Sequence, residues 1–278
     1  MINGHTQFIA HVGYPTGTFK SPMIYNPWFE KHGVNAVVVP MGVQSPDYAD
    51  CLRALFRMTN ICGALVTMPH KVVTMDLVDE VTPTAAIAGA CNAVRRLPDG
   101  RLLGDQFDGE GFVRGVRRKG LKLAGAKALV SGNGGVGCAI AASLAAAGVG
   151  ELMLFDANTA ASEGLADRLR QHYPQLVVRT GDKDPAGYDL IVNATPLGMN
   201  AGDPLPFDVD RIAPTTMVGE VVMKHEFTPL LEAAVAKGCP YQLGTDMLFE
   251  MIPAYLEFFG LGTTSAEELR EVARISYS

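Results

Sequence analysis

Apolar runs of strand length alternate with stretches of helical periodicity along most of the chain. In its first part the runs cover residues 7–13, 36–41 and 63–67, and helices are predicted from Ser21-Pro22 onward and over residues 47–58. Strands that alternate with helices imply a parallel sheet. This part of the pattern therefore predicts an α/β fold.

A helix, a hairpin and a second helix are predicted between residues 72 and 119. A polar stretch over residues 72–80 has a helical pattern, and residues 92–96 and 102–103 flank the turn sequence Pro98-Asp99-Gly100, which predicts a hairpin. Residues 108–119 then predict a helix that leads into the next part of the chain.

The alternation continues beyond residue 120. Strands are predicted near residue 128 and over residues 152–155, 176–179, 190–195 and 217–222. Helices are predicted over residues 139–147, 228–236, 247–259 and 265–275.

The apolar run that begins at residue 128 stops abruptly in glycines. Gly132, Gly134 and Gly137 match the spacing G-x-G-x-x-G, whose glycines permit a tight turn and let the backbone approach a pyrophosphate at a helix start. The next strand ends in Asp156, close to the distance at which an acid can hold a ribose 2′-hydroxyl. The motif predicts a dinucleotide site; the alternative is an ordinary turn without a ligand.

Composition narrows the class of protein. With 278 residues, 48% of them hydrophobic and 19% charged, the chain has enough apolar material for two cores, so two domains are preferred. The net charge of −6 argues against a nucleic-acid partner. The N-terminus has no signal region, and no apolar run approaches the roughly 18 residues of a membrane span. We therefore expect a soluble, cytoplasmic protein without a membrane partner.

The positions of cysteine and histidine argue against a metal site. The five cysteines are scattered and never form a C-x-x-C pair, which favours reduced thiols over a disulfide frame or a zinc site. No two of the six histidines have the spacing of metal ligands. His70 is expected to line a cleft or to face water.

Three short segments gather polar groups beside predicted turns. Thr67 and Lys71 follow the end of a buried strand, Asn92 lies in a second segment, and Asp108 belongs to a third. A lysine beside an aspartate can act as an acid–base pair on an alcohol, because partial burial lowers the pKa of the amine and the carboxylate orients it. Taken singly, Lys71 also fits a surface lysine, and Asp108 a helix N-cap.

Five spaced motifs, in one order, resemble those of the shikimate/quinate dehydrogenase family, from about Gly13 to about Leu248. They are Gly13-x-Pro15 with Lys20-Ser21-Pro22, Val66-Thr67-x-Pro69-x-Lys71, Gly89-Ala90-x-Asn92, Gly104-Asp105-x-x-Asp108-Gly109, and Asn193-Ala194-Thr195-Pro196-x-Gly198-Met199.

The resemblance implies two α/β domains with a cleft between them. Residues 1–107, completed by C-terminal helices over residues 245–278, would form the substrate domain, and residues 108–244 a Rossmann domain. The implied reaction is reversible hydride transfer between a ring alcohol carbon and nicotinamide. Lys71 matches the catalytic lysine and Asp108 its carboxylate partner. Positions that bind the substrate by hydrogen bonds are matched by Ser21, Thr67 and Asn92.

Four positions depart from the family pattern. Phe19 replaces a serine that binds the substrate carboxylate, Phe107 replaces a threonine, Met223 a tyrosine, and Met251 a substrate-binding glutamine. Two aromatic rings and two thioethers make one end of the pocket drier and more adaptable. The pattern predicts an altered pocket that acts weakly on shikimate or quinate, or preferentially on a less polar cyclic hydroxy compound.

The residue at the end of the second predicted Rossmann strand indicates which cofactor is preferred. NADP-selective relatives place an arginine at its end, whereas this chain has Asp156 there, which would repel a 2′-phosphate. NAD is therefore favoured, while Arg168 and Arg179 leave NADP as the alternative. The predicted cofactor-binding residues are Gly132, Asn133, Gly134, Gly135, Val136, Gly137, Asp156, Asn193, Thr195 and Pro196.

Two other functions compete with this one. An enzyme of the methylene-tetrahydrofolate dehydrogenase type is disfavoured by the motifs around Lys71 and Asp108. A catalytically weak, nucleotide-binding regulatory protein could keep the same fold, because fold alone does not fix function. The expected partner is a small cyclic hydroxy compound, and the chain is expected to be a monomer or a homodimer.

Overall fold

The computed structural model describes residues 2–17 and 19–275 and has the α/β fold that the sequence predicted. The chain divides into two compact units. The first comprises the described residues of Met1–Phe107 and Ile252–Ser278, and the second is Asp108–Met251.

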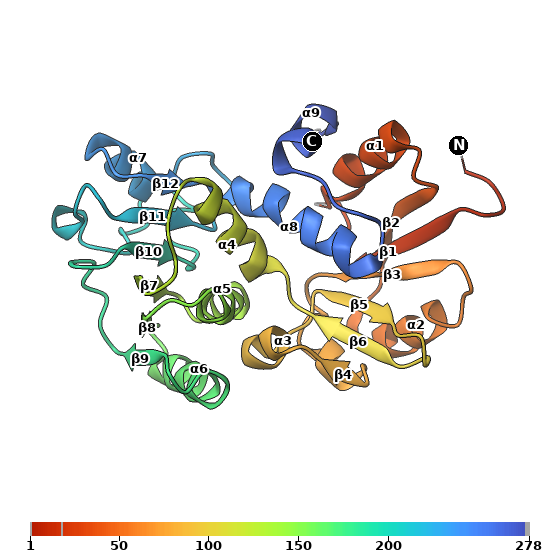
Figure 1. Cartoon of the computed structure of the whole chain (residues 1–278), viewed down its shortest axis with the longest axis horizontal. Helices are drawn as coiled ribbons and strands as arrows, with labels where there is room; N and C mark the ends of the chain where they lie inside the picture. The colour runs from red at the N-terminus through yellow and green to blue at the C-terminus, as the bar shows by residue number, and fades with distance from the viewer. Residues whose placement is uncertain (1, 18, 276–278) are drawn as a thin grey trace. The chain divides into compact units, whose positions relative to one another are not determined.

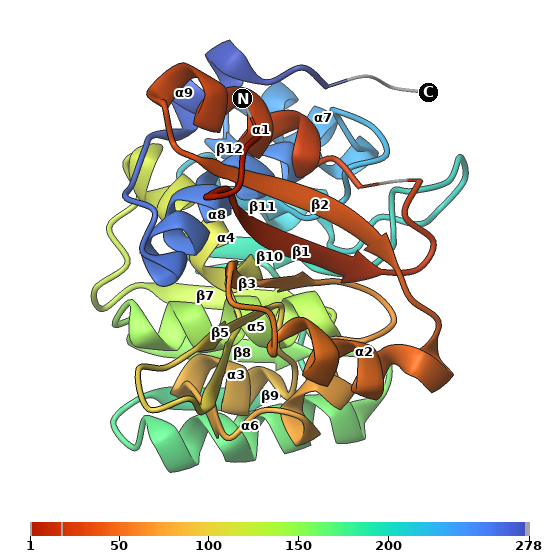
Figure 2. The same cartoon turned by 90° about the vertical axis from the view of Figure 1, so that its right-hand side faces the viewer.

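The first unit contains a six-stranded sheet in the order β2-β1-β3-β5-β6-β4. The strands are β1 (Gln7–Gly13), β2 (Ala36–Gly42), β3 (Ile61–Val66), β4 (Glu80–Val81), β5 (Ala93–Arg96) and β6 (Leu102–Asp105). β1 pairs in parallel with β2 and β3, side by side in Figure 2, so their carboxyl ends share one edge. β5 runs antiparallel to β3 and β6, as the predicted hairpin requires.

The helices of this unit are α1 (Pro22–His32), α2 (Tyr48–Leu55), α3 (Pro83–Ala88) and α9 (Ala266–Val272), with short 3₁₀ turns at Ser45–Asp47 and Val73–Asp76. The helix predicted over residues 72–80 is wrong, because only the turn at Val73–Asp76 forms and the chain then enters β4. The β-branched residues Val72, Val73 and Thr74 disfavour a helix. The backbone that follows pairs with β6, beginning with the bond from Asp79 N–H to Leu102 O.

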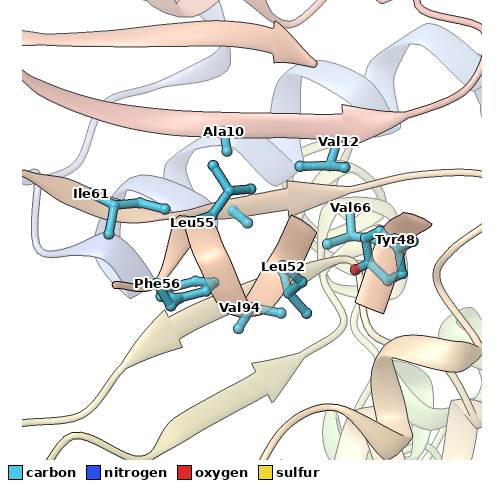
Figure 3. Packing of buried hydrophobic residues seen from close by; sticks show 10 residues of the cluster. Ala10, Val12, Tyr48, Leu52, Leu55, Phe56, Ile61, Val66 and Val94 are labelled. Atoms are coloured by element: carbon cyan, nitrogen blue, oxygen red, sulfur yellow. The ribbon is translucent and has the colours of Figure 1, made fainter. Parts of the chain in front are cut away.

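A cluster of apolar side chains fixes α2 against the strands. Figure 3 shows Leu52 and Leu55 from this helix beside Ala10 and Val12 of β1 and Val66 of β3. All five are at most 5% exposed. This core holds the carboxyl ends of β1 and β3 in fixed positions, and the turns that follow those strands carry the predicted substrate residues.

The second unit contains a parallel six-stranded sheet in the order β12-β11-β10-β7-β8-β9, which Figure 1 shows from top to bottom. The strands are β7 (Lys127–Ser131), β8 (Glu151–Phe155), β9 (Val177–Thr180), β10 (Leu190–Asn193), β11 (Met217–Glu220) and β12 (Tyr241–Gln242). Renumbered within the unit, the order is 3-2-1-4-5-6, that of a dinucleotide-binding Rossmann fold. Such folds bind ligands where the order reverses, here between β7 and β10.

The helices of the second unit are α4 (Asp108–Arg118), α5 (Gly135–Ala146), α6 (Thr159–His172) and α7 (Pro229–Ala236), and α8 (Gly244–Phe259) runs across the boundary between the units. A Cβ at Gly109 would collide with the Ala139 carbonyl, so glycine lets α4 pack closely on α5. None of the helices within residues 2–17 and 19–275 is long and apolar enough to cross a membrane.

Candidate active site

The turns after β1 and β3 are joined by backbone hydrogen bonds. Thr67 N–H donates to Val12 O at 2.9 Å, and Tyr14 N–H donates to Met68 O at 3.0 Å. A Cβ at Gly13 would collide with Thr67 Cγ2 and would lie 2.9 Å from Phe19 Cζ. Gly13 therefore lets two predicted substrate residues, Thr67 and Phe19, come together.

A second set of hydrogen bonds gathers the other predicted segments. Cys91 N–H donates to Lys71 O at 2.9 Å, and Asn92 N–H donates to Asp105 O at 2.9 Å. Asn92 is 1% exposed, and its Oδ1 accepts a hydrogen bond of 2.9 Å from Phe107 N–H. The first unit thus brings together the backbones around Lys71, Asn92 and Phe107. Asp108 follows Phe107 directly as the buried first residue of α4.

His70 supports the turn that carries Lys71. It is 1% exposed, so the expectation that it faces water is wrong. Its ring stacks on Tyr48 with centroids 4.0 Å apart, and its Nε2 lies 2.8 Å from Val43 O, which makes Nε2 the donor. Thr74 completes the support, because its hydroxyl donates to His70 O at 2.8 Å. His70 is therefore a packing residue beneath Lys71.

Ser21 precedes α1 as its N-cap residue, but its side chain makes no capping hydrogen bond. Its backbone is already helical, with φ −51° and ψ −46°, whereas a capping serine ordinarily has extended dihedral angles. The Ser21 hydroxyl, which the family resemblance assigns to substrate binding, is therefore not used to cap the helix.

His11 is a residue that the sequence analysis missed. It is 8% exposed on β1, and its ring stacks on Phe19 with centroids 4.0 Å apart and an interplanar angle of 20°. Burial, and then the charge of Lys71, lower the pKa of His11 to about 4, so the imidazole is neutral at pH 7. A lone histidine within the apolar run of residues 8–12 was the signal in the sequence.

In the second unit, the predicted dinucleotide-binding turn packs tightly against neighbouring backbone. Gly132 has φ +93°, and a Cβ there would lie 2.7 Å from the Ala194 carbonyl carbon. A Cβ at Gly137 would collide with Gly132 O. Gly134 and Gly135, in contrast, are exposed, and a Cβ at either would have no atom within 4 Å. The turn is closed on the protein side and open at the start of α5.

Asp156 is bound to this turn. Its Oδ2 accepts a hydrogen bond of 2.7 Å from Asn133 N–H, and its Oδ1 accepts one of 2.8 Å from Asn158 N–H. Asn133 Oδ1 accepts from the Ser162 hydroxyl at 2.7 Å, while Asn133 Nδ2 is buried without a hydrogen-bond partner in the described part of the chain. An open helix start, a carboxylate at the end of β8 and an unsatisfied amide in the turn fit a dinucleotide.

Asn193 organises the neighbouring turn, which the resemblance assigns to the cofactor. It is fully buried, its Oδ1 accepts hydrogen bonds from Thr195 N–H and Oγ1, and its Nδ2 donates to Glu220 at 3.0 Å. Glu220, which the sequence analysis also missed, accepts further bonds from Thr228 Oγ1 and from two backbone N–H groups. Burial raises the pKa of Glu220, and these donors oppose that shift. The network holds the Thr195 turn beside Gly132.

The remaining departures from the family pattern have different surroundings. In the first unit, the Phe107 ring packs edge-on against Tyr255, with centroids 4.9 Å apart. In the second, Met223 is 50% exposed, and Met251 lies over Gly111, where a Cβ would come within 2.6 Å of Met251 Cβ. Among the residues that the structure describes, no cluster of three or more potential metal ligands is found.

Comparison with known proteins decides the family. A protein of Acidiphilium cryptum named shikimate dehydrogenase (NADP(+)) is 35% identical over 263 residues, covering 94% of this chain and 93% of that protein. The chain belongs to the shikimate dehydrogenase family. It is therefore an NAD(P)-dependent oxidoreductase of the shikimate/quinate dehydrogenase type, as the motifs predicted.

Family models and solved structures agree with this membership. Residues 12–94 match the shikimate dehydrogenase substrate binding domain, and residues 113–179 match the ThiF family. Shikimate 5-dehydrogenase from Listeria monocytogenes, solved with shikimate and NAD, is 27% identical, with a TM-score of 0.91 over 98% of this chain and 97% of that one. Quinate dehydrogenase from Corynebacterium glutamicum, solved with NAD, is 29% identical, with a TM-score of 0.84 over 96% and 98%.

Proposed function

We propose that this enzyme interconverts a ring hydroxyl and a ring ketone of shikimate, quinate or a related cyclic hydroxy compound, with Lys71 and Asp108 as its acid–base pair. The observation that carries the proposal is the set of hydrogen bonds joining the segments of Lys71, Asn92 and Phe107, which ends one residue before Asp108. Substrate binding is assigned to residues 1–107 with the C-terminal helices, and dinucleotide binding to residues 108–244.

Each of these residues has a chemical task. A bound nicotinamide ring supplies the hydride acceptor for oxidation or the hydride donor for reduction. Lys71 Nζ takes the hydroxyl proton during oxidation and returns it during reduction, and the Asp108 carboxylate orients the amine. The bond from Phe107 N–H fixes the amide plane of Asn92, whose NH₂ group is a donor for a substrate hydroxyl. Ser21 and Thr67 supply hydroxyl groups.

We also propose that NAD is preferred over NADP. The Asp156 carboxylate at the end of β8 would repel a 2′-phosphate bound beside it, and residues 157–163 contain no cation. Arg179 pairs with Glu151 at 3.1 Å, at the opposite end of β8 from Asp156. Arg168 donates to Gly164 O on its own helix and also to Cys138 Sγ on α5, so this cation stays near the glycine turn. A cation does adjoin the end of β8, since Lys183 Nζ lies 5.6 Å from the centre of the Phe155 ring, and the assay must therefore compare both cofactors.

The substrate pocket is proposed to be altered relative to that of shikimate-specific relatives. Phe19 and Phe107 supply rings, and Met223 and Met251 thioethers, where the family pattern has polar groups. When a polar group of the substrate has no hydrogen-bond partner in the pocket, the binding free energy becomes less favourable by about 1–3 kcal/mol. Shikimate and quinate are therefore expected to be weaker substrates than less polar cyclic alcohols.

An initial-rate assay at 340 nm tests the proposal. Shikimate, quinate and a series of less polar cyclic alcohols would each be offered with NAD and with NADP, beside the variant Lys71→Ala and the matched control Lys122→Ala at an exposed position. We expect NAD-dependent oxidation that Lys71→Ala abolishes and Lys122→Ala retains. NAD binding without turnover of any alcohol would contradict the proposal and favour the regulatory alternative.

A further inference from the structure

One buried polar side chain in the first unit has no task in the proposed reaction. His11 is only 8% exposed, and its Nδ1 has no hydrogen-bond partner within the described part of the chain. The ring lies nearly flat on Phe19, at a centroid separation of 4.0 Å. An unsatisfied buried nitrogen is destabilising unless something compensates it, so its retention calls for a ligand or a functional reason.

The pair lies at the predicted substrate site. Ala10 and Val12 point into the core of Figure 3, and side chains alternate along a strand, so His11 is on the opposite face of β1. On that face, a Cβ at Gly13 would lie between Thr67 Cγ2 and Phe19 Cζ. The charge of Lys71 reaches the His11 ring. The stacked pair therefore adjoins Thr67, a predicted substrate-binding residue, and the charge of the proposed acid–base residue acts on it.

The stacked pair of His11 and Phe19 is chemically unsuited to binding an anion. A phenyl ring has no donor, and its face is the negative part of its quadrupole, so a carboxylate against it would be buried without partners. A neutral imidazole has one donor and one acceptor nitrogen, which matches a hydroxyl group and only half matches a carboxylate, since a carboxylate can only accept. At position 19 the family resemblance implies a serine that binds the substrate carboxylate, whereas this chain has a phenylalanine.

We propose that His11 and Phe19 form a specificity-determining pair that selects cyclic alcohols without a carboxylate. The inference rests on the proposed dehydrogenase function and names its substrate class. Phe19 excludes the charged group, and His11 both supports the phenyl ring and offers a nitrogen to an uncharged hydroxyl.

The test compares shikimate with its methyl ester, in which the charge at the carboxyl group is removed. The ratio of kcat/KM for the ester to that for shikimate would be measured with NAD for the wild type, Phe19→Ser and Phe19→Leu. Phe19→Ser restores a hydroxyl, and Phe19→Leu is the matched control that stays apolar. His11→Phe preserves the aromatic stack and removes both nitrogens, and it would be measured with the ester and with an uncharged cyclic diol.

For the wild type, kcat/KM is expected to be about tenfold higher for the ester than for shikimate, because one unpaired polar group lowers binding by about that factor. Phe19→Ser should reverse this preference through a lower KM for shikimate, and Phe19→Leu should retain it. His11→Phe should raise KM for the diol about tenfold at nearly constant kcat, because a uniform binding contact is lost.

A wild type that prefers shikimate, or equal ratios for Phe19→Ser and Phe19→Leu, would overturn the inference while leaving the dehydrogenase intact. If no compound is turned over, the proposed function fails. Calorimetric titration with shikimate and with its ester then tests the role of His11 and Phe19 independently of catalysis. Tighter binding of the ester supports the pair, whereas tighter binding of shikimate, or no binding of either compound, overturns it.

Discussion

The glycine turn of the second unit and the turns of the first unit that are proposed to bind the substrate are specified in different ways. The turn at Gly132–Gly137 depends on backbone geometry, because two of its glycines stand where a Cβ would collide with neighbouring backbone atoms. The proposed substrate turns are joined by backbone hydrogen bonds, but the groups proposed to select the substrate are side chains, among them Phe19 stacked on His11. A site made by the backbone tolerates few changes, whereas a site lined by side chains can change its ligand while the fold stays the same.

The largest stability effect is expected from Gly137→Ala. Its Cβ would collide with Gly132 O, so the turn must deform, and we expect a loss of about 3 kcal/mol or more in the free energy of unfolding. NAD affinity should fall with it, because the deformed turn misplaces the start of α5. Urea unfolding and calorimetric titration with NAD measure the two effects.

Gly134→Ala is the matched control in the same turn. Its φ of −76° suits alanine, and a Cβ there meets nothing within 4 Å, so the free energy of unfolding should change by less than about 0.5 kcal/mol. Equal destabilisation by the two variants would contradict the claim that the first and third glycines serve packing while the middle of the turn is left for the ligand.

The next largest effect concerns the pH dependence of stability at His11. The pKa of His11 is lowered from 6.5 to about 4 in the folded state, so the unfolded chain binds the proton first as the pH falls. Stability is therefore intact above pH 6.5 and decreases by roughly 2–3 kcal/mol as the pH falls to about 4. Below that pH the folded state is protonated too, and this loss stops growing.

His11→Phe should remove this component of the pH dependence, and His172→Phe, at an exposed position, should not. Urea unfolding at pH 7 and at pH 4.5 gives the difference for each variant. An unchanged difference in His11→Phe would show that the stacked imidazole is not the group that titrates.

A smaller effect is expected from Asp156→Ser, which tests the end of β8. Without the carboxylate, NAD loses a ribose partner while NADP escapes repulsion, so the preference for NAD in kcat/KM should fall about tenfold or more. Asp167→Asn, an exposed change of the same charge on α6, is the control. If Asp156→Ser leaves the preference unchanged, another group distinguishes the 2′-hydroxyl of NAD from the 2′-phosphate of NADP. Lys183, beside Phe155 at the end of β8, is then the first candidate.

These two regions also differ in how far the sequence could predict them. The Rossmann turn was predictable, because glycines at this fixed spacing between a strand and a helix are typical of dinucleotide-binding turns. The proposed substrate residues could be named only through the family resemblance, since the segments of Thr67, Lys71 and Asn92 are far apart in the sequence and are joined by backbone hydrogen bonds. His11 was missed because stacking on Phe19 is a tertiary contact that leaves no periodicity in the sequence.

Errors in local structure have a similar origin. The polar pattern over residues 72–80 fits a helix, but strand pairing between Glu80 and Leu103 decides the conformation at the end of that segment. Glu220 falls inside the strand predicted over residues 217–222, where nothing in the sequence marks it, and only the fold shows the donors that surround it. Tertiary pairing overrides local preference at such positions.

The most direct test of the account is a single-turnover measurement of alcohol oxidation with saturating NAD, followed at 340 nm, for the wild type, Lys71→Met and Lys122→Met. General-base catalysis contributes about 10²–10⁴-fold, so Lys71→Met should slow the chemical step by that factor while NAD binding stays unchanged. Lys122→Met should match the wild type. A Lys71→Met enzyme that oxidises the alcohol at the wild-type rate would contradict the account, because the proton would then leave by another route.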